Sequence, residues 1–457
     1  MYNVYITRIK NLRPHSNADR LLIGDCFGNP VIVSLDCQPD QLGVYLPTDG
    51  QVSVEFAEAN NLLRRKDDAG NNVGGYLDAE KRNIKALRLR GEKSDGLFLD
   101  LDSLSSFGDI SSLKEGDIVT VFNGHEIACK YIPRRNSSSH SSTGGNRTRK
   151  KKVPVSPLFA EHADTEQLAY NLGAFKAGDY IEVSLKMHGT SQRTGYLPVL
   201  SGYKRTLWDR LTRKEGTPIY DWGYVSGTRR VVLDNYDGGF YGSNEFREQH
   251  SKVFEGKLMK GETCYYEVVG FTTSGQPIMG DGNNEKVGKE FVKQYGKTTT
   301  FSYGCVPTPE THYTDLNDLD SAYIVSQSDI YVYRMTFTNE DGFTIDYTPD
   351  FVRYRCEQMG VKTVPLLWSG IIPEHTGSHD DYTIEPGEWI KKIAEQYYDG
   401  PDPIGKTHVR EGVVVRIVNR PKFCAFKHKN HNFKMLEGII KESAEAPDVE
   451  EAQDIVE

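Results

Sequence analysis

A basic segment at residues 130–152 divides the chain into two parts. The segment reads KYIPRRNSSSHSSTGGNRTRKKK and holds eight Lys or Arg and no acidic residue. Such a composition cannot bury enough apolar surface to order itself, which is typical of a linker. We predict a basic flexible linker over 126–152, between a domain at 1–125 and a larger one at 153–440, with an acidic tail at 441–457. The cations favour a tether for nucleic acid; a soluble hinge is the alternative.

Composition excludes several classes of protein. The 457 residues suffice for two to four domains, and the formal charge of −9 provides no uniform basic field for nucleic acid. No apolar run approaches the roughly 18 residues of a membrane helix, and the start, MYNVYITRIK, lacks the apolar core of a signal peptide. Seven Cys without a CxxC pattern argue against a disulfide scaffold and structural zinc. We therefore expect a soluble, cytoplasmic monomer with no membrane partner.

The N-terminal domain is predicted to be a small all-β barrel or sandwich. Short apolar runs such as VYITRI, VIVSL and GLFLDL alternate with turns that contain Gly, Asn and Asp. The runs His15–Ile23 and Ile84–Leu97 resemble OB-fold modules that bind tRNA in synthetase-associated proteins. The resemblance implies a groove for single-stranded RNA, with phosphate contacts from Arg88, Arg90 and Lys93. A barrel that serves only as a spacer is the alternative.

The larger domain has an α+β pattern. Strand-like runs, among them YIEVSLKM, TCYYEVVGF and IYVYRMTF, are mixed with helical periodicity. One helix is predicted to begin at Pro349 behind the N-cap Thr348 and to end at Gly360. A second begins at Pro386. Its apolar face is predicted from residues spaced four apart: Trp389, Ile393 and Tyr397.

The run Lys186-Met-His-Gly-Thr-Ser191 holds a candidate covalent nucleophile at the end of a strand-like segment. A lysine attacks an electrophile only when it is deprotonated, a state that burial and neighbouring cations favour. Gly189 would let the backbone approach a nucleotide closely. A single lysine at a strand end is more often a solvated surface residue, so the run alone is a weak signal.

Four further motifs follow in a fixed order. They are YYEVVG with Glu267, YVY ending at Tyr333, EGVVV beginning at Glu411, and KHK from Lys427 to Lys429. With KMHGT they resemble motifs I, III, IIIa, IV and V of the ATP-dependent RNA ligases in the covalent nucleotidyltransferase superfamily, especially the branch related to phage T4 RNA ligase 2. Five ordered motifs over about 250 residues make the resemblance specific.

The resemblance implies a nucleotidyltransferase domain with an ATP-grasp-like ligase fold of antiparallel sheets and helices, behind an OB-like barrel. Lys186 would attack the α-phosphate of ATP, and Glu411 would bind Mg²⁺ or Mn²⁺, since hard cations prefer carboxylate oxygen. Lys427 and Lys429 alternate onto one strand face, as two ligands of one phosphate must. The resemblance implies further ATP contacts from His188, Gly189, Arg229, Glu267 (ribose) and Tyr333 (adenine).

Several departures from the family pattern narrow the interpretation. His188 replaces the Asp common in DNA ligases and capping enzymes and is familiar in phage-type RNA ligases. Only 28 residues follow Lys429, which leaves no room for a C-terminal OB domain. Arg229 best matches the motif Ia arginine, with Arg230 a near-equal candidate. The 66-residue gap between Glu267 and Tyr333 predicts an insertion at 275–328, which could cover the nucleotide or touch RNA.

The motifs together predict an ATP-dependent RNA ligase in RNA repair. It would join 3′-OH and 5′-phosphate ends through a lysyl-adenylate and an RNA-adenylate. The compact design would suit a virus- or phage-infected cell. The alternatives are an ATP-dependent DNA ligase or mixed-nick ligase and, from another class, a non-catalytic tRNA- or RNA-binding protein with a degenerate second domain. The substrate, whether a nick, a tRNA break or single-strand ends, stays open.

Overall fold

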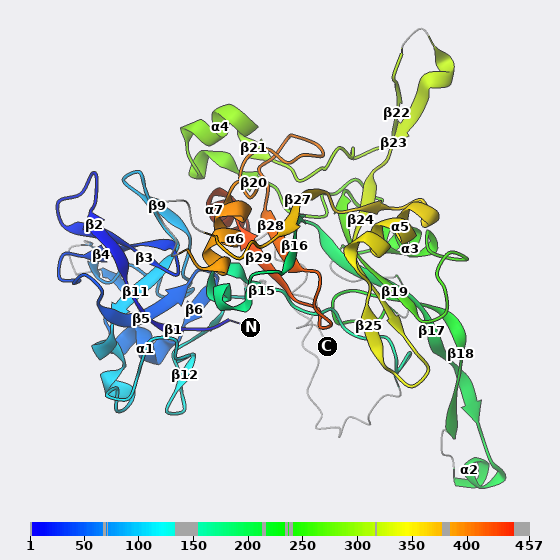
Figure 1. The fold of residues 1–457 in the computed structure, drawn as a ribbon, viewed down its shortest axis with the longest axis horizontal. Helices are drawn as coiled ribbons and strands as arrows, with labels where there is room; N and C mark the ends of the chain where they lie inside the picture. Colours follow the sequence, from blue (N-terminus) through cyan, green and yellow to red (C-terminus); the bar gives the residue numbers. More distant parts are fainter. Residues whose placement is uncertain are drawn as a thin grey trace. The chain divides into compact units, whose positions relative to one another are not determined.

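The computed structural model describes residues 2–66, 70, 72–132, 154–212, 216–233, 236, 241–315, 318–376 and 384–442 (Figure 1). Most of the expected linker and nearly all of the expected acidic tail lie outside these residues. The chain forms two compact units. The N-terminal unit comprises Met1–Pro133, Glu166–Leu172 and Lys429–Glu442, and the large unit comprises Arg134–Thr165, Gly173–His428 and Ser443–Glu457.

The N-terminal unit consists mainly of short antiparallel strands in separate small sheets. Two sheets have three strands each, in the orders β1-β5-β11 and β2-β3-β4. Their strands are β1 (Tyr5–Arg8), β5 (Leu42–Pro47), β11 (Gly96–Asp100), β2 (Lys10–Pro14), β3 (Leu21–Cys26) and β4 (Asn29–Ser34). The two-stranded pairs are β6 (Gly50–Val52) with β14 (Ala128–Lys130), β7 (Arg64–Lys66) with β8 (Asn72–Gly74), β9 (Leu87–Leu89) with β10 (Glu92–Ser94), and β12 (Val121–Phe122) with β13 (His125–Glu126). The described strands do not close into a barrel, so the OB-like barrel is not confirmed.

Two apolar clusters form the core of this unit. One lies around Val44, Leu46 and Phe56, and the other around Ile9 and Tyr45. Short helices complete the unit: α1 (Val54–Ala59), the 3-10 turns η1 (Leu101–Phe107) and η2 (Leu168–Tyr170), and the C-terminal helix α7 (His431–Glu442).

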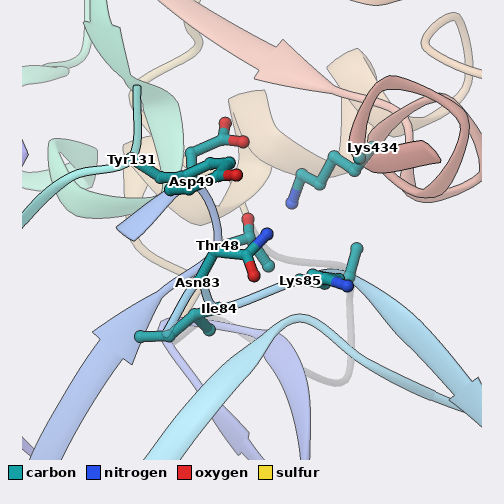
Figure 2. A pocket seen from close by; sticks show the side chains of 9 residues that line it. Thr48, Asp49, Asn83, Ile84, Lys85, Tyr131 and Lys434 are labelled. Atoms are coloured by element: carbon teal, nitrogen blue, oxygen red, sulfur yellow. The ribbon is translucent and has the colours of Figure 1, made fainter. Parts of the chain in front are cut away.

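Helix α7 is tied to the N-terminal unit by an ionic cluster around the buried Asp95. Asp95 pairs with the His431 ring at 2.5 Å and with the Lys434 ammonium at 3.0 Å. Burial by itself would raise the pKa of Asp95, but Lys434 and His431 lower it well below its usual value. Figure 2 shows Lys434 pointing into a small pocket of this unit, beside Thr48 and Asp49. The pocket contains none of the residues predicted to bind ATP or metal.

The two larger sheets of the large unit are antiparallel except for one short edge pairing. Within this unit the first has the order β29-β28-β16-β27, and the second has β18-β17-β19-β24-β25, with β26 beside β24 in parallel. The strands of the first are β16 (Tyr180–Lys186), β27 (Leu366–Ile371), β28 (Gly412–Ile417) and β29 (Ala425–Lys429). Those of the second are β17 (Thr190–Lys204), β18 (Thr217–Gly227), β19 (Glu262–Gly270), β24 (Ser328–Thr338), β25 (Thr344–Asp346) and β26 (Lys362–Thr363). The predicted α+β class is confirmed.

Helices and hairpins complete the large unit. The helices are α2 (Leu207–Thr212), α3 (Glu245–Lys252), α4 (Lys289–Tyr295), α5 (Pro349–Met359) and α6 (Pro386–Glu395). The expected insertion also contains β20 (Gly282–Asn283), η4 (Asn284–Lys286), β21 (Thr298–Thr299), β22 (Glu310–Tyr313), η5 (Leu319–Ser321) and β23 (Ala322–Val325). In Figure 1 the β17–β18 hairpin extends far from its sheet, with α2 at the tip.

Both predicted helices are present, with one difference in orientation. The Thr348 side chain accepts a hydrogen bond from the Phe351 N–H at the start of α5, and Gly360 ends the helix in the left-handed region at φ +67°. Helix α6 begins at Pro386 as predicted, but it buries Ile390 and Ala394 rather than the face predicted from spacing. Trp389 and Ile393 lie on the helix surface next to the buried face, and Tyr397 lies just beyond the end of the helix. The spacing of apolar residues does not show which side of the helix packs against the core. Among the described helices, none is long and apolar enough to cross a membrane.

Candidate active site

The candidate nucleophile and the candidate metal ligand meet at the ends of two paired strands. Lys186 is the last residue of β16 and lies opposite Gly412, the first residue of β28. This register places Glu411, one residue before β28, beside the lysine. The Lys186 Nζ lies 2.7 Å from Glu411 Oε1, with the glutamate side chain 2% and the lysine side chain 24% exposed. A buried carboxylate thus faces a lysine that remains accessible.

The turn after Lys186 is held by contacts on both sides. His188 Nδ1 lies 3.7 Å from Glu411 Oε2, and the backbone N–H of His188 donates to the Tyr303 hydroxyl at 2.7 Å. Next along the chain, Gly189 packs directly on β19. A Cβ there would lie 2.5 Å from the Val268 carbonyl oxygen and 2.8 Å from Glu267 Cγ. Glycine is therefore required for the close approach of β17 to β19.

Glu267 and Tyr333 lie on neighbouring strands of the second sheet. Glu267 is opposite Ser191 on β17 and Tyr331 on β24, so these side chains share one face of the sheet. The pairing of β19 with β24 shifts register at Tyr265/Tyr266, next to Tyr333. The Tyr333 hydroxyl shares a 3.0 Å hydrogen bond with Ser191 Oγ. Glu267, the predicted ribose contact, and Tyr333, the predicted adenine contact, are therefore both neighbours of Ser191, near the start of β17.

Arg229 and Arg230 both approach Asp164, but unequally. Arg229 lies 2.9 Å from the Asp164 carboxylate and is 23% exposed, whereas Arg230 lies at 3.8 Å and is 51% exposed. The backbone N–H of His162 donates to the Arg229 carbonyl, and the His162 ring packs on the Tyr333 ring with centroids 5.5 Å apart. Burial, then Arg229, lowers the pKa of His162 to about 3, so this ring stays neutral. The structure therefore links Arg229, the preferred motif Ia candidate, to Tyr333 through His162.

Lys427 and Lys429 alternate with buried residues on β29. Phe426 and His428 are buried, whereas the two lysines are half-buried, as expected for a shared strand face. Strand β29 is the neighbour of β28, which Glu411 precedes. Lys429, at the end of the strand, clusters with the N-terminal unit, where its Nζ lies 2.9 and 2.8 Å from the two carboxylate oxygens of Glu437.

Three residues that motif matching missed support the site. Arg247 of α3 is fully buried and donates to the Ser191 carbonyl at 3.1 Å and to Thr190 Oγ1 at 2.5 Å. Phe301 and Tyr303 come from the expected insertion and contact His188. Neither segment carries a recognisable pattern, so only their contacts in space identify them.

A divalent cation fits this site only with help from substrate. Among the described residues, no group of three or more His, Cys, Asp or Glu side chains could hold a metal. Glu411 provides one buried carboxylate. Mg²⁺ is commonly held by one or two carboxylates together with substrate phosphates and water, so a single glutamate suits such a site.

The fold is shared with a known RNA ligase. No protein-family model and no curated protein matches the chain. A structure of the Naegleria gruberi RNA ligase, a lysine-to-alanine variant with ATP and Mn, is similar at a TM-score of 0.53 and 16% identity, covering 95% of this chain and 97% of that chain. A lysine-to-methionine variant with AMP and Mn matches at 0.53 and 15%, covering 94% and 97%. The same ligase with PPi matches at 0.52 and 16%, also covering 94% and 97%.

Proposed function

We propose that the chain is an ATP-dependent RNA ligase that joins 3′-OH and 5′-phosphate RNA ends. The observation that carries the proposal is the Lys186–Glu411 pair at the adjoining ends of β16 and β28. Gly189, three residues after the lysine, packs against Glu267 of the second sheet. The fold likeness to an RNA ligase whose structures hold ATP, AMP and Mn supports the same interpretation.

The first step would place AMP on the lysine. The deprotonated Nζ of Lys186 attacks the α-phosphorus of ATP, an N–P bond forms, and the P–O bond to pyrophosphate breaks. Glu411, 2.7 Å from that nitrogen, would hold Mg²⁺ or Mn²⁺, and the lysine would lose its proton to solvent once its carboxylate partner is bound to the cation. The cation supplies charge neutralisation at the phosphates when it is bound.

Two further transfers would complete sealing. AMP passes from Lys186 to the RNA 5′-phosphate, and the RNA 3′-OH then attacks that phosphate and expels AMP. Positioning and charge neutralisation dominate such transfers. Glu267 would bind the ribose hydroxyls, and Tyr333 would stack on adenine. The proposed phosphate contacts are Arg229, Lys427 and Lys429.

The N-terminal unit would bind the RNA. Arg88 and Arg90 are exposed on and just after β9, and Lys93 on β10 lies directly opposite Arg88. Residues opposite each other in an antiparallel pair project from the same face, so Arg88 and Lys93 form a basic pair. Cations on one face are what the phosphate backbone of a single strand requires.

Mass spectrometry of the purified protein with ATP and Mg²⁺ or Mn²⁺ tests the chemistry. We expect an adduct of one AMP, absent in Lys186→Ala and retained in Lys362→Ala, which removes an exposed lysine of the same unit that pairs with Asp329. Lys186→Ala should still seal some chemically pre-adenylated RNA, because that step bypasses the lysine. An adduct on another lysine in Lys186→Ala would refute the assignment, and sealing of DNA ends in preference to RNA would identify a DNA ligase.

A further inference from the structure

The insertion contacts two chain segments, the one that follows Lys186 and the one that precedes Glu411. Phe301 packs edge-on against the ring of His188, two residues after the lysine, with centroids 4.6 Å apart. It also packs against His408, three residues before the glutamate, with centroids 5.1 Å apart. One aromatic side chain therefore touches both segments that carry the paired groups.

Tyr303 reinforces the same two contacts. Its hydroxyl accepts the His188 backbone N–H at 2.7 Å, and its ring packs edge-on against His408 with centroids 4.5 Å apart. The His188 amide lies in the turn between β16 and β17, outside the ladders of both strands. Because a buried N–H without a partner is costly, the tyrosine hydroxyl is a substantial part of what stabilises this turn.

The surroundings of Tyr303 hold its hydroxyl in place. Tyr303 is 3% exposed and has φ +49°, a region that residues other than glycine enter only where packing requires it. The next residue, Gly304, packs so closely that a Cβ on Gly405 would lie 2.9 Å from its nitrogen. Cys305 packs on Gly270 at the end of β19.

His408, in the segment that precedes Glu411, presents a fixed ring to Phe301 and Tyr303. Its side chain is fully buried, and its Nδ1 lies 3.0 Å from the Val409 carbonyl oxygen, which accepts a hydrogen bond from that nitrogen. Burial lowers the pKa of His408, in keeping with a neutral ring. A neutral, fixed imidazole can pack between two aromatic rings without the cost of a buried charge.

We infer that Tyr303 is a positioning residue for lysine adenylation: its hydroxyl fixes the backbone of His188 and thereby keeps Lys186 in place beside Glu411. The insertion at 275–328 then serves the chemical step rather than only covering nucleotide or touching RNA. The inference rests on the proposed ligase function.

Tyr303→Phe tests the inference because it removes only the hydroxyl. We expect the rate constant of AMP-adduct formation at saturating ATP to fall about tenfold, as loss of one buried hydrogen bond can produce, with the KM for ATP within about twofold of wild type. The matched control is Tyr241→Phe. It removes a tyrosine hydroxyl that donates to the Ile278 carbonyl, elsewhere on the same insertion, and should leave the rate unchanged.

Hydrogen exchange separates this inference from the proposed function. Exchange at the His188 amide should be faster in Tyr303→Phe and unchanged in Tyr241→Phe, whatever the enzyme does with ATP. Unchanged exchange at His188 in Tyr303→Phe would overturn the inference, as would faster exchange with a wild-type rate of adduct formation. Absence of any adduct in the wild-type protein would instead overturn the proposed function.

Discussion

At the scale of single residues, the pairing of Lys186 with Glu411 is the central feature of the site. The glutamate is almost completely buried and carries a charge that must be compensated. In this structure the lysine provides that compensation. With ATP bound, Glu411 would instead hold a divalent cation, and Lys186 would be free to lose its proton and attack. The same carboxylate thus suits both the resting pair and the metal-bound state.

Glu411→Gln should therefore separate shape from charge. The amide keeps the size of the side chain but is a poor metal ligand, so we expect adduct formation to slow on the order of 100-fold, about 2.7 kcal/mol of barrier. The rate should be measured over a Mg²⁺ and Mn²⁺ titration. Glu395→Gln is the control, because Glu395 pairs with His428 rather than with Lys186. A near-wild-type rate for Glu411→Gln at ordinary metal concentration would contradict the proposed role of Glu411 as the metal ligand.

At the scale of elements, the site depends on how closely β17 approaches β19. Gly189 allows that approach, and Arg247 of α3 holds the start of β17 through Thr190 and Ser191. The Glu267 side chain lies immediately beyond the glycine. Small shifts between these strands would therefore change the distance between the turn that follows Lys186 and Glu267, the proposed ribose contact.

Gly189→Ala should force the two strands apart. The new methyl group would clash with the Val268 carbonyl oxygen, so we expect a loss of about 1–3 kcal/mol in the free energy of unfolding and a clear fall in AMP-adduct formation. Urea unfolding and adduct kinetics provide the two measurements. Gly202→Ala is the matched control on the same strand, since a Cβ there meets nothing within 4 Å. Equal behaviour of the two variants would show that the close approach is unimportant.

At the scale of the whole molecule, the end of the described chain belongs to the N-terminal unit. Helix α7 follows β29 directly and is bound through Asp95 to residues early in the sequence. Removing the N-terminal unit would therefore also leave α7 without its ionic partner. Surface substitutions in the full chain are the better test of what this unit does.

The double variant Arg88→Ala/Arg90→Ala should weaken RNA binding while leaving AMP-adduct formation unchanged. The salt dependence of affinity should also become shallower, by roughly 0.7 in log–log slope for each single-strand phosphate that the protein no longer neutralises. Binding to a labelled RNA over a salt series measures both effects. Arg8→Ala/Lys10→Ala is the charge-matched control, because these two cations already pair with Asp40. An equal fall in affinity in both double variants would indicate a general charge effect instead of a binding face.

The sequence by itself determined the features that depend on local pattern. The ends of α5 follow from capping by Thr348 and Gly360, and the alternation of Lys427 and Lys429 follows from the two-residue period of a strand. The motif order also singled out Lys186 as the candidate nucleophile and Glu411 as the candidate metal ligand, and the register of β16 and β28 places the two together. Assignment of the ATP contacts stays a prediction.

Only the tertiary structure decided which distant segments support that pair. Tyr303 and His188 are 115 residues apart in the chain, and Arg247 and Thr190 are 57 apart, with no periodicity connecting them. Tertiary packing likewise decided which face of α6 is buried and that α7 associates with Asp95. Capping and strand alternation act within a few residues, whereas packing and buried hydrogen bonds join groups that only the folded chain brings within a few ångströms.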